Sequence, residues 1–302
     1  MRLLIKRLAG GRLGLAGGFL GLALFLTAQA TEPVEEPPGF DEGVIPEEIL
    51  QATIAARDLP LGERMERVSR PMLGMPYLVD AVGEGVLPDA DPPARYDVYD
   101  CLTFVEEVLA LALPADPRAA PMIRNQLRYT RGEPGYAARR HFMLEQWIPE
   151  NIASGWLKDI TAEFGETHLI EKEVTARTWA SWKHRRKFQL DDSQLPTGHY
   201  SLPVLSLDAA IAAADEIPPG ALILTVRRSK AHVPIVVTHI GFVVPSDGEP
   251  RMRHATKMGR RVVRDERLAW YFDHVRWYDW WEVEGISILM PQELGPRKTR
   301  LP

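Results

Sequence analysis

The feature that most constrains the fold of this 302-residue chain is a change of hydrophobic periodicity along its length. Before Val174 apolar residues recur mostly at helical spacing, whereas after it they gather in β-branched runs bounded by Pro or Gly. Helices are predicted over residues 47–59, 61–72, from 101 to Pro114 and within 121–160, and strands over 221–226, 236–244 and 283–290. Helices followed by strands predict an α+β fold with an antiparallel sheet.

The first thirty residues have the pattern of a cleavable secretory signal. A basic start (Arg2, Lys6, Arg7, Arg12) precedes an uncharged apolar core, and Ala28-Gln29-Ala30 predicts cleavage after Ala30. The core is shorter than the roughly 20 apolar residues of a spanning helix, so we expect export, for example to a periplasm, without stable membrane insertion. Retention of the segment as an anchor is the alternative. Residues 31–46, acidic and Pro-rich, are predicted to be a disordered leader, and residues 47–302 a single domain.

The charge of the chain argues against nucleic acid as a partner. Cleavage of residues 1–30 removes four of the 36 basic residues and none of the 41 acidic ones, so the net charge changes from −5 to −9. The remaining basic runs, at 183–187 and 227–228, are short and typical of solvated loops. An acidic surface gives no electrostatic attraction for nucleic acid or anionic lipid.

A single cysteine, Cys101, restricts the chemistry. One thiol allows no intramolecular disulfide and no Cys-rich metal site. Cys101 follows Asp100 at the predicted start of a helix, where unpaired backbone N–H groups and the helix dipole favour a thiolate. This position predicts a lowered pKa and a nucleophile. The alternative is a buried, inert thiol that packs as a small apolar residue and resists iodoacetamide at neutral pH.

Two histidines provide a base for such a thiol. His239 lies within an apolar strand, and Gly241 on the same face leaves room for another backbone. His254 follows a Pro- and Gly-containing turn, so a hairpin brings both imidazoles to one side. Each histidine has the alternative of a hydrogen-bonded core residue. The other histidines considered lack the spacing of a zinc site, so no metal or cofactor is predicted: His141, His168, His184 and His199.

Several ordered motifs resemble a known family of hydrolases. Tyr-Asp-Cys-Leu-Thr-Phe-Val-Glu-Glu (99–107), Tyr-Ala-Ala-Arg-Arg-His-Phe-Met (136–143) and Trp-Ile-Pro-Glu-Asn (147–151) resemble the DUF1460 family of N-acetylmuramoyl-L-alanine amidase-like proteins, within the NlpC/P60 class. The resemblance implies a papain-like core, with the nucleophile at a helix N-terminus packed on an antiparallel sheet, and helical insertions. It also implies that Cys101 is the nucleophile, His239 the base and His254 the residue that orients the base.

The same resemblance implies a substrate and residues that bind it. It implies a cell-wall amidase that hydrolyses the N-acetylmuramoyl-L-alanine bond of soluble muropeptides. An endopeptidase that cleaves γ-D-glutamyl-diaminopimelate and a non-catalytic wall-binding module are the alternatives. Arg139, Arg140 and His141 are candidates to bind stem-peptide carboxylates, and Tyr136 and Trp147 to contact the sugar. Basic helix faces and large aromatics at such spacing are also typical of solvated surfaces and cores, respectively.

Overall fold

A computed structural model describes residues 44–278 and 281–293, all within one compact unit that spans residues 40–302. The signal segment and all but the last three residues of the predicted leader lie outside the described residues. In the described part of the chain, no helix has the length and apolar character needed to span a bilayer.

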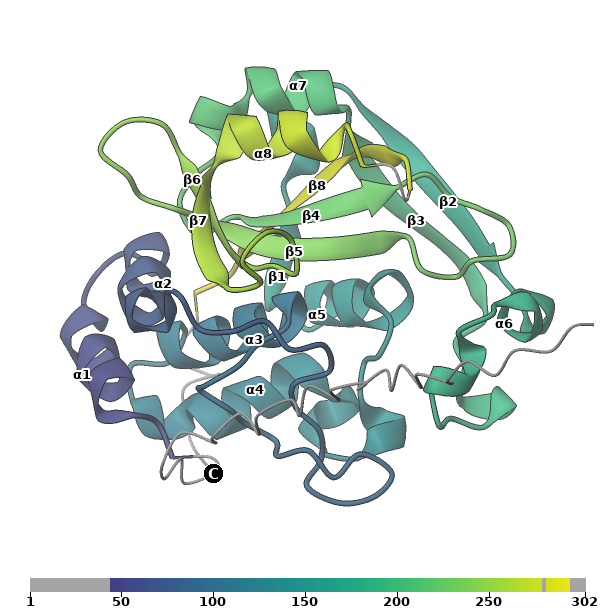
Figure 1. Cartoon of the computed structure of the whole chain (residues 1–302), viewed down its shortest axis with the longest axis horizontal. Coiled ribbons are helices and arrows are strands. Elements are labelled where there is room, and N and C mark those ends of the chain that lie inside the picture. Colours follow the sequence, from purple (N-terminus) through teal and green to yellow (C-terminus); the bar gives the residue numbers. More distant parts are fainter. Residues whose placement is uncertain (1–43, 279–280, 294–302) are drawn as a thin grey trace, which may run out of the picture. The chain divides into compact units, whose positions relative to one another are not determined.

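An eight-stranded antiparallel sheet forms the middle layer (Figure 1). Seven strands follow the order β2-β3-β8-β4-β5-β6-β7, and β1 pairs with β8 off this path. Strand β8, the last strand of the described residues, therefore lies inside the sheet, between β3 and β4. The strands are β1 (Leu157–Asp159), β2 (Thr167–Val174), β3 (Gly198–Leu205), β4 (Leu222–Arg227), β5 (Val237–Val244), β6 (Arg251–Ala255), β7 (Val263–Arg267) and β8 (Val283–Pro291).

Helices cover both faces of the sheet, because strands β4 and β5 are apolar on both sides. Leu224 and Ile240 pack in the core formed with the helices of the first half of the chain, whereas Ile223 and Val243 pack against the helices of the second half. The first group, below the sheet in Figure 1, is α1 (Glu47–Ala56), α2 (Leu61–Ser69), α3 (Cys101–Ala112), α4 (Ala120–Arg128) and α5 (Ile148–Ala153). The second is α7 (Leu207–Ala212) and α8 (Leu268–Val275), above it, and α6 (Ala176–Ser181) lies at one side.

The predicted α+β class with an antiparallel sheet is confirmed. The helices predicted from residues 47, 61 and 101 form as α1, α2 and α3, and the three predicted strands form as β4, β5 and β8. The division at Val174 is incomplete, since β1 and β2 precede it and α6, α7 and α8 follow it. Elements β1, α6 and α7 have six residues or fewer, too few for their periodicity to be identified.

Helix α3 is held rigidly from behind. Two buried carboxylates on it form ion pairs with α4, Glu106 with Arg128 at 2.7 Å and Glu107 with Arg124 at 2.6 Å. The indole nitrogen of Trp147 donates a further hydrogen bond to Glu106 at 3.0 Å. Buried pairs with several hydrogen bonds fix one geometry, so the first residue of α3 has a fixed position in the fold.

Candidate active site

Cys101 is the first residue of α3, and a capping box fixes it there. The Asp100 carboxylate accepts hydrogen bonds from the backbone N–H groups of Leu102 at 3.0 Å and Thr103 at 2.8 Å. The Thr103 hydroxyl accepts a hydrogen bond from the Asp100 N–H at 3.0 Å. Reciprocal bonds of this kind define where a helix begins. The predicted placement of the thiol at a helix start is therefore confirmed.

The thiol of Cys101 lies against strand β5. The backbone N–H of Ile240, the residue that follows His239, lies close enough to the sulfur to lower the pKa of the thiol. A β-bulge precedes this point, since Thr225 of β4 pairs with His239 whereas the next residue of β4 pairs with Val237, which leaves Thr238 unpaired. Bulges redirect the side chains beside them and are frequent near active sites. The fold thus brings the thiol and His239 to the same end of β5.

The two strand histidines are hydrogen-bonded to each other. Nε2 of His239 lies 2.8 Å from Nδ1 of His254, and the rings meet edge to face. Gly241 allows this approach, because a Cβ atom added there would lie 2.8 Å from the Arg253 carbonyl oxygen and 2.8 Å from Cβ of His254. The predicted hairpin with both imidazoles on one side is confirmed, as is the role of Gly241 in a close approach between strands.

A carboxylate lies near the outer ring nitrogen of His254. Oε2 of Glu266, on β7, lies 3.5 Å from Nε2 of His254, and Glu266 is also ion-paired with Arg264. Burial lowers the pKa of His254 well below its ordinary value, so this imidazole is neutral. The buried ring of Tyr271 packs 5.5 Å from the His254 ring, and its hydroxyl is held by Thr225 at 2.6 Å. His254 therefore has an apolar wall on one side and a partly neutralised carboxylate at its far nitrogen.

The expected lowering of the thiol pKa is wrong for this structure. Burial, with a contribution from the Asp100 charge, raises the pKa of Cys101 to about 12. The N–H groups of Ile240, Cys101 and Leu102 lower it, as expected at a helix start, but by less. Burial also lowers the pKa of His239 to about 4. Both groups are therefore uncharged at neutral pH, and the thiol needs a base when it reacts.

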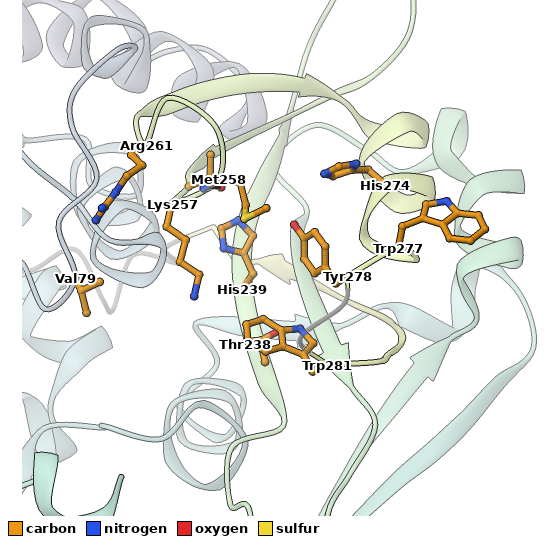
Figure 2. Close-up of a pocket in the computed structure, with 11 residues that line it drawn as sticks. Val79, Thr238, His239, Lys257, Met258, Arg261, His274, Trp277, Tyr278 and Trp281 are labelled. Atoms are coloured by element: carbon orange, nitrogen blue, oxygen red, sulfur yellow. Dashed lines mark hydrogen bonds between the residues drawn. The ribbon is translucent and has the colours of Figure 1, made fainter. Parts of the chain in front are cut away.

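A cavity of about 440 Å³ opens beside His239. Figure 2 shows four parts of the chain that line it: strand β5 in the centre, Val79 and the β6–β7 loop with Lys257 and Arg261 on one side, and residues of 274–278 with Trp281 on the other. The last of these presents three aromatic side chains, Trp277, Tyr278 and Trp281. This volume is within the usual range for small-molecule sites.

The five residues expected to bind substrate are not among those that line this cavity. Arg139 bonds to Asp89 at 2.9 Å and to the Val82 carbonyl at 2.6 Å, and Arg140 bonds to Glu150 at 2.9 Å and to backbone carbonyls. Of the remaining three, His141 forms a 2.7 Å hydrogen bond through Nε2 to the backbone carbonyl of Tyr136, and Trp147 is fully buried. The structure gives these side chains packing contacts, and their binding role stays a prediction.

Sequence patterns did not identify four other residues at the site. Burial raises the pKa of Tyr77, and the charges of Cys101 and Asp100 add to this effect, so Tyr77 lies near the thiol. Glu266, Lys257 and Arg261 reach the site through the β6–β7 hairpin, and their distance from His239 depends on strand register. A hairpin register cannot be read from two short strands, although the nearness of the loop to His254 in the chain was a usable hint. No cluster of His, Cys, Asp or Glu suited to a metal ion occurs among the described residues.

Known structures resemble this fold over most of its length. A Legionella pneumophila protein of the DUF1460 family aligns with a TM-score of 0.71 at 23% identity, covering 84% of this chain and 96% of that one. An N-acetylmuramoyl-L-alanine amidase from Bacteroides uniformis aligns with a TM-score of 0.58 at 17% identity, covering 82% and 100%. A Bacteroides fragilis protein described only provisionally as a xylanase aligns with a TM-score of 0.58 at 20% identity, covering 74% and 98%. At these identities the likeness shows the fold alone.

The sequence itself places the chain in a family. No curated protein matches it. The model of the N-acetylmuramoyl-L-alanine amidase-like family matches residues 67–276, a range that includes Cys101, His239, His254 and Glu266. This match spans more than half of the chain, and the chain therefore belongs to the N-acetylmuramoyl-L-alanine amidase-like family.

Proposed function

We propose that this protein is a cysteine amidase that hydrolyses the bond between N-acetylmuramic acid and L-alanine in soluble muropeptides. One observation carries the proposal: Cys101, the first residue of α3, lies near the backbone N–H of Ile240 on β5, while the neighbouring His239 uses Nε2 to contact His254. The other ring nitrogen, Nδ1, is then the one that can take the thiol proton. Membership of the amidase-like family supports the substrate class, and the amidase name of the Bacteroides uniformis structure agrees with it.

The contacts of the two histidines set their tautomers. To accept a proton at Nδ1, His239 carries its own proton on Nε2 and donates it to Nδ1 of His254. His254 then carries its proton on Nε2, the atom that lies 3.5 Å from the Glu266 carboxylate. We assign Cys101 as nucleophile, His239 as general base, and His254 and Glu266 as the residues that orient the base.

The reaction then proceeds in two stages. The sulfur of Cys101 attacks the lactyl carbonyl carbon while the thiol proton passes to Nδ1 of His239, which avoids a free thiolate in a site that disfavours one. The backbone N–H of Cys101 is placed to help hold the oxyanion. As the C–N bond breaks, His239 returns the proton to the leaving amine of L-alanine. Water, deprotonated by His239, then hydrolyses the thioester and releases the lactyl carboxylate and the thiol.

We further propose a papain-like core of the NlpC/P60 class, formed by α3 with the central strands of the sheet, and export of the protein through its amino-terminal segment. The nucleophile at a helix start beside a strand that carries the base supports the first of these proposals. The substrate class supports the second, because peptidoglycan fragments arise outside the cytoplasmic membrane.

Mass spectrometry of digested muropeptides tests the reaction. The proposal expects free GlcNAc–MurNAc and an intact stem peptide that begins with L-alanine. A product that retains L-Ala-D-Glu on the sugar supports the γ-D-glutamyl-diaminopimelate endopeptidase instead. Full activity in a Cys101→Ala variant contradicts the nucleophile, and an inactive wild-type protein that binds muropeptides supports a wall-binding module.

A further inference from the structure

The described residues that line the cavity beside His239 carry a charge opposite to that of the chain. The chain has a net charge of −5, yet the described residues that line the cavity include Lys257 and Arg261 and no Asp or Glu. Glu266, the carboxylate behind His254, is paired with Arg264. A cavity with fixed cations and an aromatic wall favours a ligand that carries a carboxylate next to an apolar or sugar surface.

Both cations line the same cavity as His239. The Lys257 ammonium is 5.3 Å from the centre of the Trp281 ring, and its charge contributes to the lowered pKa of His239. Arg261 lies on the same side of the cavity as Lys257, and its charge opposes the raised pKa of Tyr77. An anion bound by these cations therefore lies in the cavity that His239 lines.

The loop that carries the cations is fixed in place. Its ends are joined by a hydrogen bond from the Thr256 N–H to the Val262 carbonyl at 3.2 Å, and the Arg261 N–H donates to Met258 at 3.3 Å. The Arg261 carbonyl also accepts a hydrogen bond from the Tyr77 N–H at 2.8 Å. A loop held in this way loses little conformational freedom when a ligand binds.

We propose that Lys257 and Arg261 form a carboxylate subsite for the residue next to L-alanine in the stem peptide, D-glutamate, whose α-carboxylate is free because the chain continues through its γ-carboxyl. That carboxylate lies one residue beyond the scissile amide, which fits cations in the cavity beside the base. The aromatic wall formed by Trp277, Tyr278 and Trp281 then covers the neighbouring part of the muropeptide. This inference rests on the proposed function and specifies which stem peptides the site accepts.

Two synthetic ligands that differ only at this carboxylate test the subsite. Both are N-acetylmuramoyl dipeptides, one ending in L-Ala-D-glutamate and the other in L-Ala-D-isoglutamine. The second carries a carboxamide in place of the α-carboxylate. Their affinities are measured by calorimetry on the full chain with Cys101→Ala, which prevents turnover. We expect the carboxylate ligand to bind about tenfold more tightly, the effect of one charge-assisted hydrogen bond.

Variants of Lys257 then locate the effect. In the same background, Lys257→Met is expected to reduce the preference to less than about twofold, and Lys257→Arg to retain most of it. Lys187→Met is the matched control, since Lys187 is exposed and is not among the residues that line the cavity. Thermal unfolding of each variant verifies that it is folded. If Lys257→Met does not fold, Lys257→Arg still provides the test.

Equal affinity for the two ligands, binding of neither, or a preference that survives Lys257→Met overturns the subsite. None of these outcomes depends on hydrolysis. A wild-type protein that cleaves neither ligand, while Cys101→Ala prefers the carboxylate, contradicts the proposed function and leaves the subsite supported.

Discussion

Replacement of Gly241 by Ala tests the link between strand packing and the histidine pair. The added methyl group would lie 2.8 Å from the Arg253 carbonyl oxygen and 2.8 Å from Cβ of His254, about 0.6 Å inside the 3.4 Å at which ordinary contact begins. Met252 can move its terminal methyl aside, but the backbone of β6 must shift as a unit. Insertion of a methyl group into such a packed site costs about 1–3 kcal/mol.

The same shift separates the two histidines. A displacement of β6 by about 0.6 Å takes the contact between His239 and His254 from 2.8 Å to beyond good hydrogen-bond length. We therefore expect kcat for muropeptide hydrolysis to fall about tenfold with KM little changed, because misplacement of a catalytic group mainly slows the chemical step.

Urea unfolding and steady-state kinetics measure the two effects. Gly135→Ala is the matched control, because a Cβ at Gly135 meets no atom within 4 Å and its φ of 167° is ordinary extended backbone. The control is expected to change the free energy of unfolding by less than about 0.5 kcal/mol. If Gly241→Ala is as stable and as active as the control, the close approach of β6 to β5 does not position His254, and the reasoning fails.

Four further predictions follow from the site and its supports. Cys101→Ala should abolish hydrolysis and leave the thermal midpoint nearly unchanged; retained activity would exclude Cys101 as nucleophile. Glu266→Gln should lower kcat more than it raises KM and alter the 15N NMR tautomer signals of the histidine pair, whereas a purely structural role predicts altered stability with unchanged tautomers. Arg124→Met should cost about 3–5 kcal/mol of unfolding free energy, measured in urea, because it leaves buried Glu107 unpaired; a loss below about 1 kcal/mol would contradict this pairing. The free energy of unfolding should fall as the pH drops from 6.5 towards 4. The unfolded chain protonates His239 in this range, whereas the folded protein, in which the pKa of His239 is about 4, does not. The loss reaches about 3 kcal/mol, and His239→Gln should flatten the decline by that amount in urea unfolding at stepped pH.

The sequence predicted those parts of the site that depend on local pattern. The helix start at Cys101 follows from Asp100, Thr103 and the apolar spacing that comes after them, and these signals lie within one helix. The hairpin that joins His239 to His254 follows from two apolar runs and a turn between them. Local signals of this kind identify elements without the rest of the fold.

The parts that failed depend on distant packing. The thiol pKa was expected to fall because the helix start is a local feature, but the burial that raises it is created by strand β5, far away in the sequence. Arg139 and Arg140 were expected to meet substrate carboxylates, whereas the fold supplies Asp89 and Glu150 as partners. Neither burial nor the choice of ion-pair partners can be read from a sequence pattern.

The central place of β8 has a consequence for how the chain reaches its folded state. The strands beside it, β1, β3 and β4, are formed from residues before 228, so each lacks this neighbour until Val283–Pro291 has been synthesised. A nascent chain that ends before residue 283 carries strand edges with unpaired backbone groups, the kind of edge that promotes aggregation. We expect completion of the sheet to be a late, post-translational event, and carboxy-terminal truncation to be far more damaging than loss of a peripheral strand would be.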